Sequence, residues 1–196
     1  MNIAVYGAAS PEIEEIYVKE VEELGENLAK RGHNLVFGAG QNGLMGAAAR
    51  GFKKGGGKVY GVIPEFFKNE DIEDICTICD EYYFTKNMAE RKAKMEELAD
   101  GFVIAPGGIG TFEEFFQVLT LKQLGQHKKP IALFNINGYY YGILSLLHTG
   151  VEEEFLRENC LSLFKTFEEN EDEQIIAYLE AGPDVGDVKV RDLKYG

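Results

Sequence analysis

Short runs of β-branched and aromatic residues alternate along this chain with longer stretches whose apolar residues recur at helical spacing. The runs predict strands at NIAVYG (2–7), NLVFG (34–38), KVYGVIP (58–64), EYYF (81–84), FVIA (102–105) and PIALFN (130–135). The amphipathic stretches predict helices over 11–31, 43–54, 87–99, 111–124, 139–148 and 172–180. Such alternation predicts an α/β fold, a doubly wound parallel sheet with crossover helices on both faces.

The length and composition favour one domain. The chain has 196 residues and is 45% hydrophobic, which is enough to bury a single sizeable core. It contains no linker and no repeat, and the tail GPDVGDVKVRDLKYG has no usable periodicity. We therefore expect a single nucleotide-binding domain over 1–196.

The net charge restricts the possible partners. With 33 acidic against 20 basic residues the formal charge is −13, and no basic run compensates for it. This field repels polyanions, so nucleic acid is not expected, whereas a small anion can still bind where local donors attract it. No apolar run reaches about 18 residues, and MNIAVYG lacks the regions of a signal peptide. We expect a cytoplasmic protein that does not contact membranes.

Three cysteines exclude a complete disulfide framework within one chain. CTIC, from Cys76 to Cys79, has the spacing of a redox or metal pair. However, it has no second Cys/His pair and does not open a helix after a strand, so a metal or redox role is not favoured.

The segment GYYYGILSLL (138–147) is apolar nearly all round. A helix of this kind belongs either to the core or to a subunit interface, and the sequence leaves both possibilities open.

Two glycine-rich junctions follow predicted strands, where helix N-termini attract anions. Gly38, Gly40 and Gly43 fit G-x-G-x-x-G, and Glu65 lies about twenty residues beyond, as in dinucleotide-binding proteins. This fingerprint normally occupies the first strand–helix turn, whereas here it occupies the second. The alternative is a tight turn in which the strand and helix approach closely.

The other junction is PGGIGT (106–111). Because no lysine follows Gly110, it is not a Walker A loop, and nucleoside triphosphate hydrolysis is not expected. A backbone cradle closed by the Thr111 hydroxyl suits one phosphate, as in a nucleoside monophosphate or a sugar phosphate.

The carboxylates after this loop have a structural interpretation. Thr111 and Glu114 have the spacing of a capping box, and Glu113 would favour the helix dipole. Phe112, Phe115, Phe116 and Leu119 recur at helical spacing and are expected to anchor the helix on the sheet.

Arg91 lies within an apolar stripe. In NMAERKAKMEELAD the stripe consists of Met88, Met95, Leu98 and Ala99, and a helical projection places Arg91 inside it. A buried guanidinium must meet a carboxylate, carbonyl groups or a ligand, so either an internal salt bridge or a shared cleft with the glycine loop is expected.

MAERKAKM (88–95) and PGGIGTFEE (106–114) together resemble the paired signatures of the LOG ("lonely guy") family of cytokinin riboside 5′-monophosphate phosphoribohydrolases, long labelled lysine decarboxylases. The similarity extends over about residues 2–157. The resemblance implies a Rossmann-like homodimer that hydrolyses the N-glycosidic bond of AMP or a cytokinin riboside monophosphate. The products would be the free base and ribose 5-phosphate, and no cofactor or metal would be required. Nothing in the chain marks a Schiff-base lysine.

The resemblance also implies site residues by position. Arg91 and Glu114 match the catalytic pair of the family. The substrate-contacting positions match Lys92, Gly107, Gly108, Ile109, Gly110, Thr111, Glu113 and Thr120. This chain departs from the family at Ala89, often histidine, at YGAAS, often CGSS, and at Ile109, often tyrosine or phenylalanine.

The chemistry of a carboxylate is consistent with this implication. Departure of the base from C1′ builds oxocarbenium charge, which Glu114 can stabilise while it or a neighbour directs water. Arg91 would orient Glu114 and the ribose hydroxyls, or help neutralise the leaving base. The alternative is a non-catalytic nucleotide carrier or sensor, which needs the glycine loop but no inward carboxylate.

Overall fold

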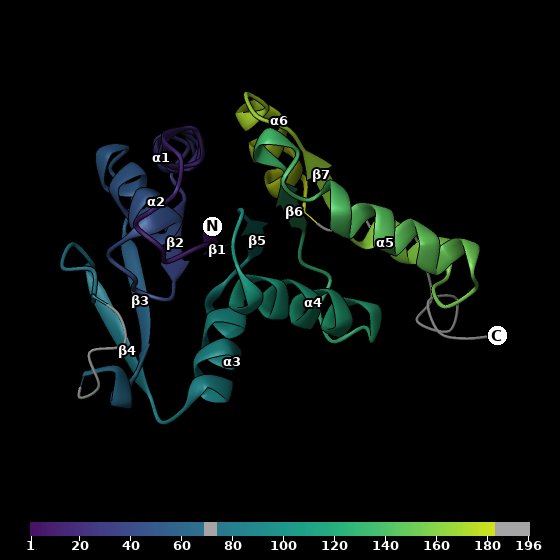
Figure 1. The fold of residues 1–196 in the computed structure, drawn as a ribbon. Helices are drawn as coiled ribbons and strands as arrows, with labels where there is room; N and C mark the ends of the chain where they lie inside the picture. Colours follow the sequence, from purple (N-terminus) through teal and green to yellow (C-terminus); the bar gives the residue numbers. More distant parts are fainter. Residues whose placement is uncertain (69–73, 183–196) are drawn as a thin grey trace.

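The computed structural model describes residues 1–68 and 74–182. Seven parallel strands form one sheet in the order β4-β3-β2-β1-β5-β6-β7 (Figure 1). The strands are β1 Asn2–Tyr6, β2 Asn34–Phe37, β3 Val59–Pro64, β4 Glu81–Thr85, β5 Gly101–Ile104, β6 Ile131–Phe134 and β7 Lys165–Phe167. The predicted Rossmann-like α/β fold is confirmed.

Helices cover both faces of the sheet (Figure 1). The six α-helices are α1 Glu15–Lys30, α2 Gly43–Lys54, α3 Met88–Leu98, α4 Ile109–Gln123, α5 Tyr141–Glu152 and α6 Asp172–Ala181, and the 3₁₀ turns are η1 Glu65–Lys68, η2 Ile136–Gly138 and η3 Glu158–Leu163. Buried residues of α1, α2 and α6 share one hydrophobic core, and those of α3, α4 and α5 share the other. Both faces of the sheet are thus covered, as right-handed crossovers require when the chain moves outward from β1 in both directions.

The central strand shows how the sequence supplies two cores. Along β1, Ile3 and Val5 belong to the α1/α2/α6 core, whereas Ala4 and Tyr6 belong to the α3/α4/α5 core. All four are at most 3% exposed. A strand that is buried on both faces reads as a continuous apolar run, which is why NIAVYG shows no polar alternation.

Several elements differ from the predictions, including helix α5, which runs from Tyr141 to Glu152 rather than over 139–148. Strand β7 was not predicted, because KTF offers three residues and no pattern. Helix α1 begins at Glu15 rather than near Pro11, since the Ser10 hydroxyl accepts the Glu12 N–H in a local turn. Helix α4 begins at Ile109, two residues before the predicted start. The C-terminal tail after residue 182 lies outside the described residues.

Among the residues described, no helix is both long and apolar enough to span a bilayer.

Candidate active site

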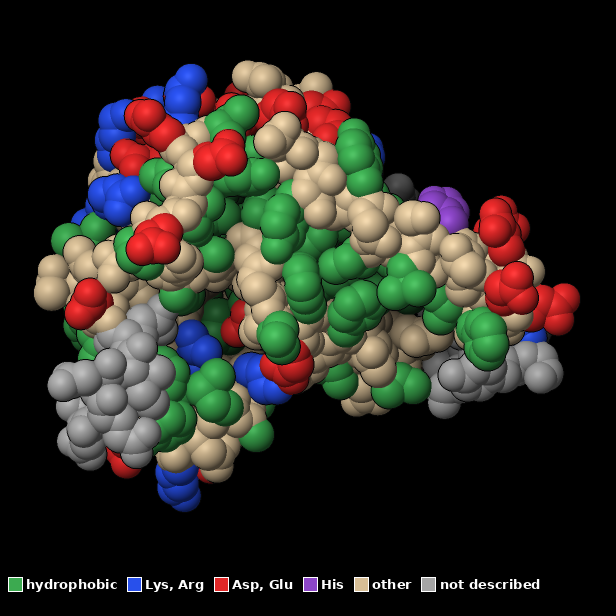
Figure 2. All heavy atoms as spheres, viewed as in Figure 1, with side chains coloured by type: hydrophobic (Ala, Val, Ile, Leu, Met, Phe, Trp, Pro, Cys, Tyr) green, Lys and Arg blue, Asp and Glu red, His purple; other side chains and the backbone are tan. Residues whose placement is uncertain are grey.

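The site lies where the chain reverses direction across the sheet. β1 pairs with β2 on one side and with β5 on the other, so the loops that follow β1 and β5 diverge at their carboxyl ends. Ligands of open α/β sheets bind in the crevice at this switch point. Figure 2 shows acidic and basic side chains gathered around a hollow near the start of α4.

The loop after β5 presents an open helix N-terminus. Gly108 is the N-cap residue of α4, and Phe112 donates the first intrahelical hydrogen bond to its carbonyl oxygen (3.0 Å). The N–H groups of Ile109, Gly110 and Thr111 precede this bond and point outward along the axis. Gly108, Ile109 and Gly110 are exposed, Ile109 by 86%. These donors and the helix dipole are available to an anion.

The glycines of this loop have two roles: Gly107 allows close packing, whereas Gly108 and Gly110 leave space beside the N–H donors. A Cβ at Gly107 would lie 2.1 Å from the Thr111 hydroxyl oxygen, so this position must be glycine for Thr111 to pack there. The Tyr139 hydroxyl donates to the Gly107 carbonyl oxygen (2.6 Å) and fixes the loop from the other side. Around Gly108 and Gly110, a Cβ would meet no described atom within 4 Å, which leaves room for a ligand.

The predicted capping box at Thr111 and Glu114 is wrong. Gly108 caps α4 with extended backbone angles (φ −90°, ψ −156°), and no side chain caps the helix. Thr111 therefore lies inside the first turn, where it is 4% exposed and sits beside Gly107. Glu114 is freed from the helix end and lies in the second turn.

Arg91 is buried, as its position in the apolar stripe predicted, and it donates to two backbone carbonyl groups. Helix α3 begins at Met88 because the Asn87 side chain caps it by accepting the Glu90 N–H (2.9 Å). From its second turn Arg91, 6% exposed, donates to the carbonyl oxygens of Val62 (Nε, 3.2 Å) and Gly38 (Nη2, 3.1 Å). The guanidinium is thereby locked at the ends of β3 and β2.

Glu114 faces the third edge of this guanidinium. Its Oε1 lies 3.9 Å from Arg91 Nη1, and its side chain is 13% exposed. The separation is an ion pair rather than a hydrogen bond, so a ligand hydroxyl or a water molecule can approach both groups. The pair brings together the two predicted catalytic residues.

Tyr6 is a neighbour that the sequence analysis did not single out. It ends β1, is 2% exposed, and has its pKa raised well above the usual value, first by burial and then by the negative charge of Glu114. Its phenol is therefore neutral beside the carboxylate. The sequence feature that could have identified Tyr6 as a site residue is its position at the end of the central strand.

Lys92 and Glu113 form an ion pair that joins α3 to α4 at the rim of the site. One turn further, Gln117 donates to the Glu96 carboxylate between the same helices. The Glu96 pKa is raised, chiefly by burial. These contacts set the spacing between Arg91 and Glu114.

Thr120 is the predicted substrate contact that the structure does not bring together with the others. It is exposed on α4, nine residues beyond Thr111, which corresponds to about 13 Å along a helix axis.

The fingerprint at Gly38, Gly40 and Gly43 forms a packing turn. The N–H groups of Leu44 and Met45, which would meet a pyrophosphate, point at the Ala8 carbonyl oxygen (2.8 and 3.4 Å). Gly43 has φ +57°, and a Cβ there would lie 2.4 Å from the same oxygen. The structure therefore favours the second of the two interpretations, a close strand-to-helix approach.

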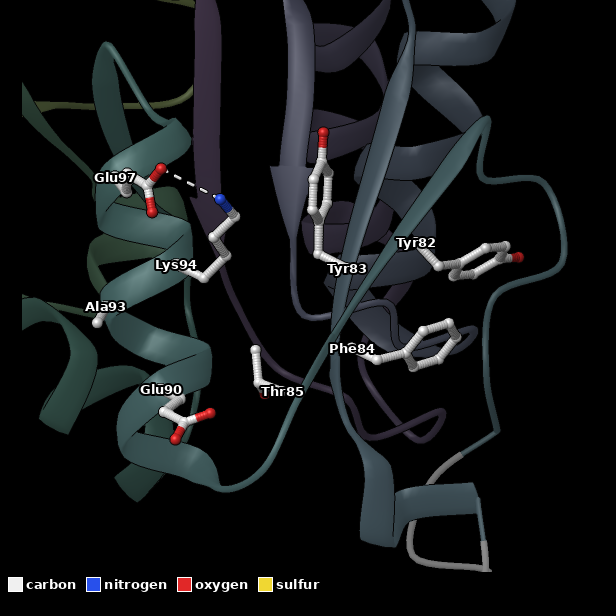
Figure 3. Close-up of a pocket in the computed structure, with 8 residues that line it drawn as sticks. All are labelled: Tyr82, Tyr83, Phe84, Thr85, Glu90, Ala93, Lys94 and Glu97. Carbon is white, nitrogen blue, oxygen red and sulfur yellow. Dashed lines mark hydrogen bonds and ion pairs between the residues drawn. The ribbon is translucent and has the colours of Figure 1, made fainter.

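Two pockets flank the site. One, of ≈ 240 Å³, adjoins the glycine loop and is lined by Ala8, Ile13, Tyr17, Pro106, Gly107, Gly108 and Tyr139. The other, of ≈ 440 Å³, is an open groove between β4 and α3, where Tyr83 and Thr85 face Lys94 and Glu97 (Figure 3). No predicted site residue lines this second groove. Within the described part of the chain, no group of three His, Cys, Asp or Glu residues is arranged to hold a metal ion.

The fold and the loop define a Rossmann-like α/β protein with an anion-binding helix N-terminus. A family model described as "Possible lysine decarboxylase" matches residues 45–178. The chain is 39% identical over 159 residues to the cytokinin riboside 5′-monophosphate phosphoribohydrolase LOG of Oryza sativa subsp. japonica, covering 81% of this chain and 65% of that protein. It is 37% identical over 164 residues to LOG4 of Arabidopsis thaliana, covering 81% and 73%. This chain belongs to the LOG family.

Solved structures support the fold at lower identity. The molybdenum cofactor carrier protein of Chlamydomonas reinhardtii superposes with a TM-score of 0.68 at 22% identity, covering 92% of this chain and 96% of that one. The molybdenum cofactor binding protein of Rippkaea orientalis gives 0.66 at 18% identity, covering 92% and 94%.

Proposed function

We propose that this protein hydrolyses the N-glycosidic bond of adenosine-type nucleoside 5′-monophosphates, AMP or a cytokinin riboside monophosphate, to the free base and ribose 5-phosphate. The observation that carries the proposal is the Arg91–Glu114 ion pair, 3.9 Å apart with side chains 7% and 13% exposed, beside the open N-terminus of α4. Named relatives with this activity support it.

The proposed roles follow from where each group lies. The N–H groups of Ile109, Gly110 and Thr111, with the Thr111 hydroxyl and Lys92, would bind the 5′-phosphate. The ribose would then extend toward Glu114, because the carboxylate lies one turn further along the same helix. Glu113 would keep Lys92 in place at the rim.

Bond cleavage would use the charge of Glu114. As the C1′–N bond breaks, its electron pair leaves with the base and positive charge develops on the ribose ring, which the carboxylate stabilises. Water adds to C1′, one of its protons is lost, and the leaving base takes up a proton. Arg91, fixed by two carbonyl groups, would hold Glu114 in position and bind ribose hydroxyls.

The direct test is to incubate the purified protein with AMP and with isopentenyladenosine monophosphate and to measure free base by chromatography. Base release from either supports the proposal. Tight binding without release would instead favour a carrier, the role named for the Chlamydomonas reinhardtii protein that shares this fold. A carrier gives no reason for a largely enclosed carboxylate paired with Arg91 beside the phosphate loop.

We further propose that the protein is a homodimer. Side chains of α5 and the segment after it are exposed despite being apolar: Tyr141 by 60%, Leu146 by 67% and Phe155 by 73%. A symmetric interface would cover these side chains. It would also allow Thr120 of one chain to approach a nucleotide bound in the site of the other chain. Light scattering at micromolar concentration should give twice 21.9 kDa, and Leu146→Glu should reduce it to the monomer mass. A monomer that keeps full activity on dilution would contradict this.

A further inference from the structure

Cys76 and Cys79 lie at the two ends of a tight turn. Thr77 and Ile78 form the turn, which joins the short bridge between Ile75 and Gly40 to strand β4. The first and fourth Cα atoms of a β-turn lie within about 7 Å. A disulfide requires about 4.4–6.8 Å, a range that this limit overlaps, so a small movement of the turn is enough to form the bond.

The two thiols differ in access and charge. Cys76 is 2% exposed, whereas Cys79 is only half-buried. The pKa of Cys76 is lowered to about 6, mainly because the Cys79 thiol donates a hydrogen bond to it and because the Ile78 N–H and the Arg50 charge also favour the thiolate, against the opposing effect of burial. The pKa of Cys79 is raised, first by that hydrogen bond. The hydrogen bond between the thiols therefore favours the thiolate on Cys76 and the protonated thiol on Cys79.

We propose that Cys76 and Cys79 are a reversible dithiol–disulfide site whose oxidant is a small-molecule disulfide. Proton transfer from Cys79 to Cys76 makes the more accessible sulfur the thiolate, which attacks the oxidant, forming a mixed disulfide and expelling one thiolate. Cys76 then loses its proton and attacks Cys79 Sγ, expelling the second thiolate. The protein loses two electrons and two protons, and the oxidant becomes two thiols.

The turn is connected to Arg91 through backbone hydrogen bonds. The Cys76 N–H donates to the Ala39 carbonyl oxygen (2.7 Å), and the Gln41 N–H donates to Asp74 (2.8 Å). The adjacent Gly38 carbonyl accepts from Arg91 Nη2. Drawing the two sulfurs into a bond moves Cys76 relative to this loop, so oxidation is expected to displace the carbonyl that holds the guanidinium.

A second contact restrains the turn on its other side. The Tyr82 hydroxyl donates to the Cys76 carbonyl oxygen (2.7 Å). Cys76 is therefore held both by Tyr82 and by Ala39 of the Gly38–Gln41 loop. The effect on activity rests on the proposed function, whereas formation of the bond does not.

The first experiment measures the bond itself. The intact protein is treated with glutathione disulfide, and its mass and peptide map are compared with the reduced form. We expect loss of two hydrogen atoms and a Cys76–Cys79 link in the wild type and in Cys160→Ser, which removes the remaining, buried thiol. Cys79→Ser should not form the link. A stable glutathione adduct on Cys79 without closure, or a link through Cys160, would overturn the proposal.

The second experiment measures the coupling. Base release from the nucleoside monophosphate should fall several-fold in the oxidised wild type, return on adding dithiothreitol, and be unaffected by oxidant in Cys79→Ser. Unchanged base-release rates in a fully linked protein would refute the coupling to activity but not the proposed disulfide. If the protein releases no base in either redox state, the proposed function is refuted, whereas the disulfide is still tested by the mass measurement.

Discussion

Replacement of Glu114 by glutamine tests the central assignment most directly. The substitution keeps the shape and one oxygen acceptor but removes the charge 3.9 Å from Arg91 Nη1. Arg91 retains its hydrogen bonds to Val62 and Gly38, so the buried guanidinium keeps two acceptors. We expect a folded protein whose stability falls by about 1–3 kcal/mol.

The expected effect on the rate can be worked from this distance. Two unit charges about 4 Å apart interact by about 4 kcal/mol at an effective dielectric constant of about 20. A ribose cation bound between the loop and Glu114 would lie at a similar separation. Since about 1.4 kcal/mol corresponds to a tenfold change, the variant should release base roughly 1,000-fold more slowly. Nucleotide binding should change far less, because the phosphate-binding groups remain.

The assay is base release from AMP followed by chromatography, with nucleotide affinity and thermal denaturation measured on the same samples. Glu97→Gln is the matched control. It removes an equal charge from the neighbouring helix α3, but Glu97 is 69% exposed and forms a surface ion pair with Lys94. The control should keep the wild-type rate.

A Glu114→Gln rate within about threefold of wild type, with intact folding, would refute the reasoning, because no carboxylate would then be stabilising charge. Equal losses in both variants would point instead to the general negative field of the protein.

Three further predictions concern the phosphate loop, the surroundings of Arg91 and the half-buried His127. Thr111→Ala should weaken binding of AMP far more than of adenosine in calorimetry, and equal losses would mean that the loop does not hold phosphate. Gly38→Ala should reduce activity about as strongly as Arg91→Ala, since a Cβ would lie 1.6 Å from Arg91 Nη2, and base-release rates of the two variants are the measurement. The pKa of His127 is lowered by burial, so the folded state favours the neutral ring and unfolding takes up a proton; the free energy of unfolding should therefore decrease as pH falls through about 6.5 and below. Urea denaturation of wild type and His127→Gln should show a smaller decrease in the variant, and identical pH profiles would contradict this.

Most of the sheet could be predicted because its inner strands are buried on both faces and therefore read as short apolar runs. Strand β7 could not, since three residues at a sheet edge carry no period. The start of α1 was placed too early because Pro11 resembles a first helical residue, whereas Ser10 forms a turn there. Local hydrogen bonds of this kind are not encoded in hydrophobic spacing.

The site was predictable in parts. The burial of Arg91 followed from its position in an apolar stripe, but its acceptors, the carbonyl groups of Val62 and Gly38, are backbone atoms that no side-chain pattern reveals. The capping box failed because Gly108 takes the cap position with extended backbone angles. The neutral phenol of Tyr6 depends on burial from elements distant in the chain. Whether the predicted residues bind or catalyse stays a prediction.

The strand order also has a consequence for synthesis on the ribosome. β1 to β4 form one contiguous half of the sheet, yet β1, at residues 2–6, pairs on its other side with β5, at residues 101–104. A nascent chain that has emerged only as far as β4 therefore exposes an unpaired strand edge that is apolar on both faces, the kind of edge that other chains can join. We expect ribosome-bound chains stalled before β5 to be cleaved readily by protease and to recruit chaperones, and those stalled after β6 to be protected.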